Sequence, residues 1–332
     1  MTTIADVAQR AGVSTATVSR VLSRPELVAP ETRLRVRAAV DLLGYEPNGM
    51  ARSLRTARAS RILLTVPIIS NPVFSDVIRG AERAAREAGY AVILGETRDN
   101  PEQADAYWAM MRGHEIDGIV FASAGLPPAL AALIADGRGR APVVAVCEFD
   151  PGYGVSGVHV DDEGAAHGVI SRFIELGHRR IGVIAGPDTP TSHARLAGAR
   201  RAMAERGMAG ALHVGTGDYT IERGFAAAGD LIDDGVTAIF CFSDEMAIGA
   251  LARVRDRRLD CPGAISIVGF DDIRFCRYPT PALATVAQPA IDMGVAAVEL
   301  LLDRIAGTRS GIEVRTLPWR LIERGSMGPA PA

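Results

Sequence analysis

Short runs of apolar residues alternate with amphipathic stretches over residues 61–328 of the chain. Such runs are typical of strands that are buried on both faces of a parallel sheet. Stretches such as 74–89 and 245–258 instead carry their apolar residues on one helical face. The alternation predicts an α/β fold with doubly wound parallel sheets. Strands are expected in RILLTVPI, AVILGE, IDGIVFAS, PVVAVCE, GVHVD, RRIGVIAG, AIFCFSD and SIVGFDD.

Two blocks of this pattern begin in a similar way, near Arg61 and near Arg180. Each opens with a strand, which is followed by a loop that contains proline and then by a helix. Two lobes of about 100–130 residues fit this repeat better than one long sheet. A ligand site is expected in the cleft between two such lobes.

The N-terminal residues predict a compact helical head. Thr3 and Asp6 give a capping-box-like start to a first helix. Gly12 permits the turn that follows, and Ser14 can cap a second helix over 15–22. Two helices joined by a short glycine turn have the geometry of a helix-turn-helix, whose second helix enters the major groove of DNA. A small helical bundle with an exposed polar helix is the alternative.

The second helix carries the candidate DNA-reading residues, because Val18 and Val21 are expected to face inward. Arg20 can form a bidentate contact with guanine, and Ala16 can touch a thymine methyl group. The candidates on this helix are Thr15, Ala16, Thr17 and Arg20.

A third helix is expected from Pro30 or Glu31 to Leu43, with its apolar positions closing the core of the head. Residues 47–60 are small and polar and resemble a linker with one or two helical turns. These patterns divide the chain into a head (1–46), a linker (47–60) and a two-lobed body (61–328). The core positions expected on the third helix are Leu34, Ala38, Leu42 and Leu43.

Charge is distributed unevenly along the chain. Residues 1–60 carry a balance of +4, whereas the whole chain carries −3, so the remainder is acidic. A basic head on an acidic body suggests a polyanion partner for the head alone. The N-terminus lacks the apolar stretch of a secretory signal, and no apolar run reaches the length of a membrane span. We therefore expect a cytoplasmic protein; the four cysteines show no metal-site spacing, and no cofactor is expected.

The order of these motifs resembles the lactose/galactose/purine repressor family of transcription factors over nearly the whole chain. The resemblance implies a repressor that binds a palindromic operator as a homodimer or a higher oligomer. It also implies two lobes of the periplasmic-binding-protein type that hold a small-molecule effector. The matching segments are TIADVAQRAGVSTATVSRVLSRPELVAPETRLRVRAAVDLLGYEPNGMARSL, RILLTVPIISNPVFSDVIRGAE, DGIVFAS, ELGHRRIGVIAGP, RLAGAR, AIFCFSDEMAIGAL, SIVGFDDIRFCRYPTPALATVAQP and LLLDRI.

A hinge helix from Asn48 to about Thr56 is a further implication of the resemblance. In the family, two such hinges enter the minor groove, where Leu54 matches a leucine that wedges between base pairs, and Ala51 and Arg55 match its companions. A helix of this length is marginal in water, so its folding can depend on DNA. The alternative is an inert polar linker with one chance leucine.

Most candidate ligand-binding residues follow the predicted strands, because ligands in open α/β sheets meet the carboxyl ends of the strands. Arg195 and Tyr219 are expected in connecting loops. Acceptors, one forked donor and two aromatic rings suit a polyhydroxylated ring as ligand. By resemblance, Arg195 holds ligand hydroxyls, Asp271 accepts from the ligand and Tyr219 stacks on it. The effector candidates are Asn71, Phe74, Glu148, Arg195, Tyr219, Ser243 and Asp271.

The chain departs from the family pattern at several positions. Cys147 stands where many members carry an aspartate ligand, so either Glu148 replaces that contact or the contact is absent. Ser243 replaces a frequent asparagine, and the loop before Arg195 is one residue shorter, which leaves Thr191 unassigned. These changes leave a sugar or a nucleoside as the effector. The phrases VAVCEF, FCFSDEMAIGAL and LIERGS are most similar to the cytidine-repressor branch and favour a nucleoside.

Two other classes of function are alternatives to a regulator. A nucleoside- or sugar-processing enzyme would need a catalytic motif, but the chain has no P-loop, GxSxG or HExxH, and its histidines lack ligand spacing. A periplasmic-type sugar-binding protein would share the two-lobed fold but would need an export signal and has no use for a basic head. The sequence therefore favours a regulator that is not an enzyme.

Overall fold

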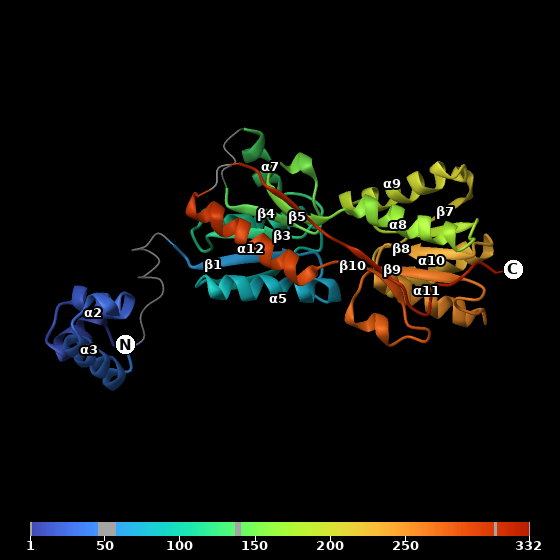
Figure 1. Ribbon diagram of the computed structural model, residues 1–332. Helices are drawn as coiled ribbons and strands as arrows, with labels where there is room; N and C mark the ends of the chain where they lie inside the picture. Colours follow the sequence, from blue (N-terminus) through green and yellow to red (C-terminus); the bar gives the residue numbers. More distant parts are fainter. Residues whose placement is uncertain (1, 46–57, 137–140, 309–310, 332) are drawn as a thin grey trace. The chain divides into compact units, whose positions relative to one another are not determined.

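The computed structural model describes residues 2–45, 58–136, 141–308 and 311–331 (Figure 1). The chain divides into two compact units, and the division falls between Ala59 and Ser60. Among the described residues, no helix combines the length and the apolar character that a membrane span requires.

The first unit is helical, with α1 (Ile4–Ala11), α2 (Thr15–Ser23) and α3 (Pro30–Leu43). The predicted caps are confirmed, since Thr3 and Asp6 form a capping box and the side chain of Ser14 accepts from Thr17 N. Gly12 adopts a left-handed conformation with φ of 64° between α1 and α2. The predicted helix-turn-helix geometry is therefore present.

The prediction for the buried face of α3 was wrong at three of its four positions. Leu34 and Leu42 are 69% and 65% exposed, and Ala38 is exposed as well. The helix instead turns Val36 and Ala39 into the core of the head, with Val40 and Leu43 packed against them. These four residues keep the i, i+3, i+4, i+7 spacing of one helical face, and of the predicted positions Leu43 belongs to that face.

The second unit contains two six-stranded sheets, which define an N-lobe and a C-lobe. In the N-lobe sheet the order is β11-β5-β4-β3-β1-β2, and in the C-lobe sheet it is β12-β10-β9-β8-β6-β7. All neighbouring strands are parallel except β12, which pairs antiparallel with β10. The N-lobe strands are β1 (Arg61–Val66), β2 (Ala91–Glu96), β3 (Gly118–Phe121), β4 (Val143–Val146), β5 (Ser156–Val160) and β11 (Val314–Leu317). The C-lobe strands are β6 (Ile181–Ala185), β7 (Leu212–Thr216), β8 (Ala238–Cys241), β9 (Ser266–Asp271), β10 (Ala284–Ala287) and β12 (Arg320–Ile322).

Helices cover both faces of each sheet (Figure 1). The N-lobe helices are α5 (Pro72–Glu87), α6 (Pro101–Arg112), α7 (Pro128–Ala135) and α12 (Ala290–Ala306). The C-lobe helices are α8 (Asp162–Glu175), α9 (Pro190–Glu205), α10 (Ile221–Asp233) and α11 (Asp244–Asp256). Short 3₁₀ turns occur at Pro25–Leu27, Pro151–Tyr153, Ala209–Ala211 and Arg274–Arg277. This arrangement confirms the predicted doubly wound parallel sheets.

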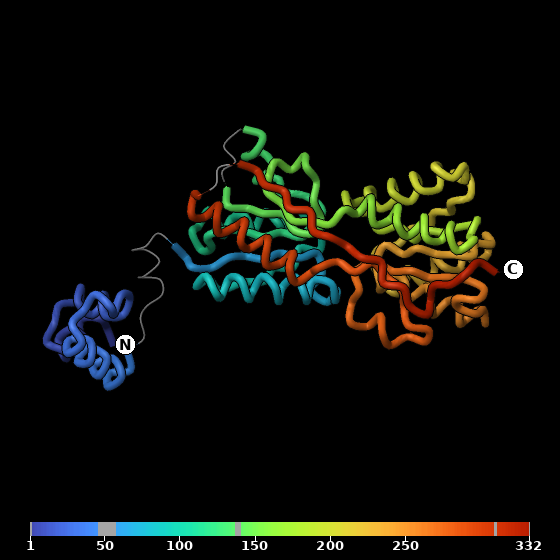
Figure 2. The backbone as a smooth tube through the Cα atoms, in the orientation of Figure 1, coloured from blue at the N-terminus to red at the C-terminus, as the bar shows by residue number. Residues whose placement is uncertain are grey.

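The chain passes between the lobes three times, after β5, after β10 and after β11 (Figure 2). The lobes are therefore not two contiguous blocks, because α12 and β11 return to the N-lobe. Sequence analysis did not find β7, β10, β11 and β12. These strands have three to five residues, and all except β10 lie at a sheet edge, so they lack a long apolar run.

Candidate functional site

A cavity of about 120 Å³ lies between the lobes, at the carboxyl ends of strands from both sheets. All seven of the effector candidates proposed from the sequence line it, together with Cys147. The structure thus brings together residues from six separate parts of the chain. Lining residues that sequence analysis did not propose include Asp99, Thr189, Thr191, Asp218 and Gln288.

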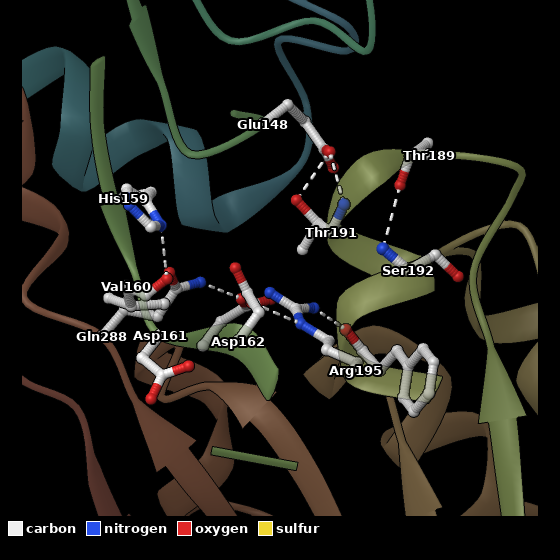
Figure 3. Close-up of polar contacts among 12 residues, drawn as sticks. Glu148, His159, Val160, Asp161, Asp162, Thr189, Thr191, Ser192, Arg195 and Gln288 are labelled. Carbon is white, nitrogen blue, oxygen red and sulfur yellow. Dashed lines mark hydrogen bonds and ion pairs between the residues drawn. The ribbon is translucent and has the colours of Figure 1, made fainter. Parts of the chain in front are cut away.

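Arg195 is the central cation of the C-lobe side of the cavity (Figure 3). Its Nε donates to Asp162 Oδ1 at 2.8 Å, and its Nη1 donates to the carbonyl of Phe242 at 2.5 Å. The guanidinium lies 3.5 Å from the ring centroid of Phe270, and the residue is only 5% exposed. Burial lowers the pKa of Arg195, but Asp162, Tyr219 and Asp271 together outweigh burial, so the pKa of Arg195 is raised. Arg195 is therefore a fixed, charged donor.

Asp271 ends β9 and accepts a hydrogen bond of 2.6 Å from Gln288 Nε2. Burial, and after it the charge of Asp244, raises the pKa of Asp271. Asp244 is buried outside the lining of the cavity and accepts from Thr285 Oγ1 at 2.6 Å and from Ile273 N at 2.8 Å. Asp244 thereby holds the loop that follows Asp271, and burial raises its pKa to about 7.

Three other C-lobe residues near the cavity have identifiable local roles. Ser243 caps α11 by accepting from Met246 N at 3.2 Å, so its hydroxyl also has a structural task. Asp272 pairs with Arg324 at 2.6 Å and does not line the cavity. Tyr219 packs over Gly186, where an added Cβ would lie 2.3 Å from Cζ of the ring. Only glycine at that position leaves room for the aromatic wall of the cavity.

The N-lobe contributes Asn71, Phe74 and Glu148 to the cavity. Asn71 caps α5 by accepting from Val73 N at 3.1 Å, and Phe74 lies in the first turn of the same helix. Glu148 reaches the opposite lobe, where its Oε2 accepts from Thr191 Oγ1 at 2.6 Å and from Thr191 N at 3.3 Å (Figure 3). Burial raises the pKa of Glu148, although these hydrogen bonds oppose the shift.

Strained backbone gathers around the cavity. Asp99, Cys147, Tyr219 and Asp271 all line it and all have positive φ, at 51°, 65°, 68° and 119°. Each follows or ends a strand, so the chain turns sharply at the strand end and directs the side chain toward the cavity. Positive φ is uncommon outside glycine and tends to gather at binding sites.

The sequence offered unequal signals for the residues that were missed. Asp99 comes soon after β2, so the strand-end rule could have found it. Gln288 follows β10, a four-residue strand that was itself not predicted. Thr191 lies at the start of α9, in the shortened loop whose residues the family pattern could not assign.

The candidate DNA-reading residues lie on α2. Thr15, Ala16 and Arg20 are exposed there. Thr17 is half-buried, and its hydroxyl lies 2.9 Å from that of Ser14 at the start of the helix. The hinge candidates Ala51, Leu54 and Arg55 lie outside the described residues.

Comparison with known proteins identifies relatives of both units. Residues 3–48 match the family model of bacterial regulatory proteins, lacI family, and residues 170–327 match a periplasmic binding protein-like domain. The HTH-type transcriptional repressor CytR of Escherichia coli (strain K12) is 38% identical, over 99% of this chain and 97% of that protein.

Two solved structures resemble the chain over its length. The complex of the transcriptional regulator CelR with cellobiose has a TM-score of 0.73 at 30% identity and covers 98% of this chain and 100% of that one. The Lac repressor dimer bound to operator and the anti-inducer ONPF has a TM-score of 0.88 at 24% identity, with coverage of 98% and 99%, and shows the shared fold. The head, the two lobes and the full-length relative together confirm the resemblance found in the sequence: the chain belongs to the lacI family of bacterial regulatory proteins.

Proposed function

We propose that this protein represses transcription by binding a palindromic operator as a homodimer, and that a nucleoside or a sugar in the interlobe cavity controls this binding. The observation that carries the proposal is that all seven effector candidates, chosen by strand-end position and family pattern, line one cavity. A ligand there contacts both lobes at once. It can therefore favour one lobe arrangement over another, as allosteric control requires.

The lining of the cavity suits a neutral ring that carries several hydrogen-bond donors. Glu148 and Asp271 are acceptors, whereas Arg195 is already engaged by Asp162 and a carbonyl group. Tyr219 and Phe74 supply apolar surface for a ring face. The 38% identity to CytR supports a nucleoside, and the relative solved with cellobiose keeps a sugar as the second candidate.

For the head we propose that α2 reads the major groove through Thr15, Ala16, Thr17 and Arg20. Ala51, Leu54 and Arg55 are proposed to contact the minor groove. One helix-turn-helix reads only a half-site, so two copies are needed for a palindrome. We place the head at 1–46, the hinge at 47–60 and the effector-binding body at 61–328, in a cytoplasmic protein without a catalytic role.

Two measurements on the purified full-length chain test this function. A thermal-shift screen of nucleosides and sugars should find a ligand that raises the unfolding midpoint, because ligand binding stabilises the folded state. That ligand should change operator affinity. Arg20→Ala should weaken operator binding by about 1–3 kcal/mol and relax the base preference at one symmetric pair of positions, without changing ligand affinity. Unchanged operator affinity and base preference in this variant would refute the assignment of α2.

A further inference from the structure

Glu148 is the point at which the two lobes meet across the cavity (Figure 3). It follows β4 of the N-lobe, whereas its partner Thr191 is the second residue of α9 in the C-lobe. The Oγ1 of Thr191 lies 2.6 Å from Glu148 Oε2, and its backbone N–H, one of the unpaired donors at the start of a helix, lies 3.3 Å from the same oxygen. A carboxylate at a helix N-terminus is also favoured by the helix dipole.

The backbone around Glu148 is built to hold this position. Cys147, with φ of 65°, turns the chain sharply after β4, and its N–H is tied to the carbonyl of Val158 at 3.0 Å. On the other side, Phe149 stacks on His159 with ring centroids 5.0 Å apart. Phe149 also covers Gly157, where an added Cβ would lie 2.2 Å from the ring. Glu148 thus extends from a segment that is fixed at both neighbouring residues.

The two carboxylate oxygens of Glu148 differ in their engagement. Oε2 receives both hydrogen bonds from Thr191, whereas Oε1 receives none from the residues that the structure describes. Glu148 lines the cavity in which Arg195 and Asp271 also lie. A ligand donor placed against Oε1 would therefore add to the contact between the lobes and would not compete with it.

We propose that Glu148 is an interlobe clamp and the specificity determinant of the cavity: Oε2 holds the C-lobe through Thr191, and Oε1 selects an effector that presents an N–H or O–H donor. The inference rests on the proposed function for the identity of the site as an effector site. The proposal also accounts for Cys147, which stands where many family members carry an aspartate ligand. The next residue, Glu148, supplies the carboxylate acceptor instead. An effector with the donor stabilises the closed arrangement, and an analogue with an acceptor in its place does not.

The clamp is tested first without any ligand. Spin labels on noncanonical residues at the exposed positions Arg83 and Arg206, one in each lobe, report the interlobe distance in full-length protein diluted with unlabelled chain. Wild type should give one narrow distribution. Thr191→Val and Glu148→Ala should broaden it, whereas Glu148→Gln, which retains an acceptor, should stay close to wild type.

Ser192→Ala is the matched control for the clamp. Ser192 is buried beside Thr191 on α9, does not line the cavity and makes no hydrogen bond to Glu148 among the described residues. It should leave the distance distribution unchanged. A wild-type distribution in both Thr191→Val and Glu148→Ala would overturn the clamp.

Donor selection is tested by calorimetry with cytidine and the ribonucleoside of pyrimidin-2-one, which lacks only the 4-amino group of cytidine and keeps N3 as an acceptor. Wild type should favour cytidine by about tenfold, the usual scale of one hydrogen bond to a charged group. Glu148→Gln, which can both donate and accept, should reduce that preference to about twofold or less. Equal wild-type affinities, or a preference that the variant leaves unchanged, would overturn the selection. Binding of neither nucleoside would refute the proposed effector class, while the ligand-free distances would still decide the clamp.

Discussion

Corresponding strands of the two lobes end with the same backbone turn, but the residues at these turns find their hydrogen-bond partners in different places. β4 and β9 occupy the same place in the order of their sheets. Cys147 after β4 and Asp271 at the end of β9 both have positive φ. Asp271 is then held by Gln288, and the adjacent Asp272 by Arg324, whereas Glu148 after Cys147 finds its partner in the opposite lobe.

This difference divides the cavity into a preformed half and a half that depends on closure. On the C-lobe side, Arg195 donates to Asp162 and to the carbonyl of Phe242, and Asp271 accepts from Gln288, so these hydrogen bonds do not involve the N-lobe sheet. The N-lobe residue Glu148 is secured only when the lobes meet. A ligand that touches both halves has unequal affinity for open and closed arrangements, and this inequality shifts a conformational equilibrium.

The largest effect on the preformed half of the cavity is expected from Arg195→Ala. The substitution leaves Asp162, which is 8% exposed, as a buried carboxylate without its cation. Removing one partner of a buried ion pair costs about 3–5 kcal/mol, and we expect that loss in the free energy of unfolding measured by urea denaturation. Ligand binding should also be lost.

Arg201→Ala is the matched control for this prediction. Arg201 lies on the same helix and pairs with Glu163, but both side chains are nearly half exposed. Exposed pairs contribute about 0–1 kcal/mol, so this variant should unfold close to wild type. Similar losses in the two variants would mean that the Arg195 pair does not organise the C-lobe.

A smaller effect is expected from Asp271→Asn, which retains an acceptor for Gln288 and suits positive φ. Ligand affinity should fall by about 1–3 kcal/mol, because a carboxylate acceptor is lost. The contribution of Asp271 to wild-type stability should decrease as the pH rises from about 4 toward neutrality, because burial raises the pKa of Asp271 in the folded state above its ordinary value of 3.8. The folded protein binds this proton over a range in which the unfolded chain has released it.

Melting temperatures measured by calorimetry between about pH 4 and pH 8 test this linkage. The asparagine variant lacks the titrating group, so its curve should decline less steeply than that of wild type. Asp244 also has a raised pKa and remains in the variant, so part of the decline persists. Parallel curves for the two proteins would show that Asp271 keeps an ordinary pKa.

The sequence predicted residues of both halves of the cavity, by two separate routes. Glu148 and Asp271 were found because ligands meet strand ends, whereas Arg195, which was expected in a loop and lies within α9, was found by its match to the family pattern. The cap residues Thr3 and Ser14 were found for a similar reason, since capping depends on residues three apart.

The remainder depends on contacts between segments that are distant in the sequence. Glu148 was proposed as a ligand, but its contact with Thr191 joins residues 43 positions apart on separate lobes. No local pattern marks Thr191, because its role arises from the start of α9 facing the end of β4. The prediction for the buried face of α3 was wrong at Leu34 and Leu42 for the same reason. The elements that pack against the helix decide which of its faces is covered.

The smallest effects are expected at two glycines, one in each lobe, that make room for aromatic rings. They test whether the two halves of the cavity behave differently. Gly186 lies under Tyr219 in the C-lobe, and Gly157 lies under Phe149 in the N-lobe, with added Cβ atoms 2.3 Å and 2.2 Å from ring carbons. Gly186→Ala and Gly157→Ala should each displace the ring at a cost of about 1 kcal/mol, the lower end of overpacking.

The two substitutions should have different consequences, although their steric cause is the same. Displacing Tyr219 should weaken ligand binding and leave the ligand-free interlobe distance unchanged, because that wall belongs to the preformed half. Displacing Phe149 should move Glu148 and broaden the interlobe distance even without ligand. Gly210→Ala, at a position with open space around the added Cβ, should change neither quantity. If Gly186→Ala broadened the distance as much as Gly157→Ala, closure would not depend specifically on the segment that carries Glu148, and the division of the cavity into two halves would fail.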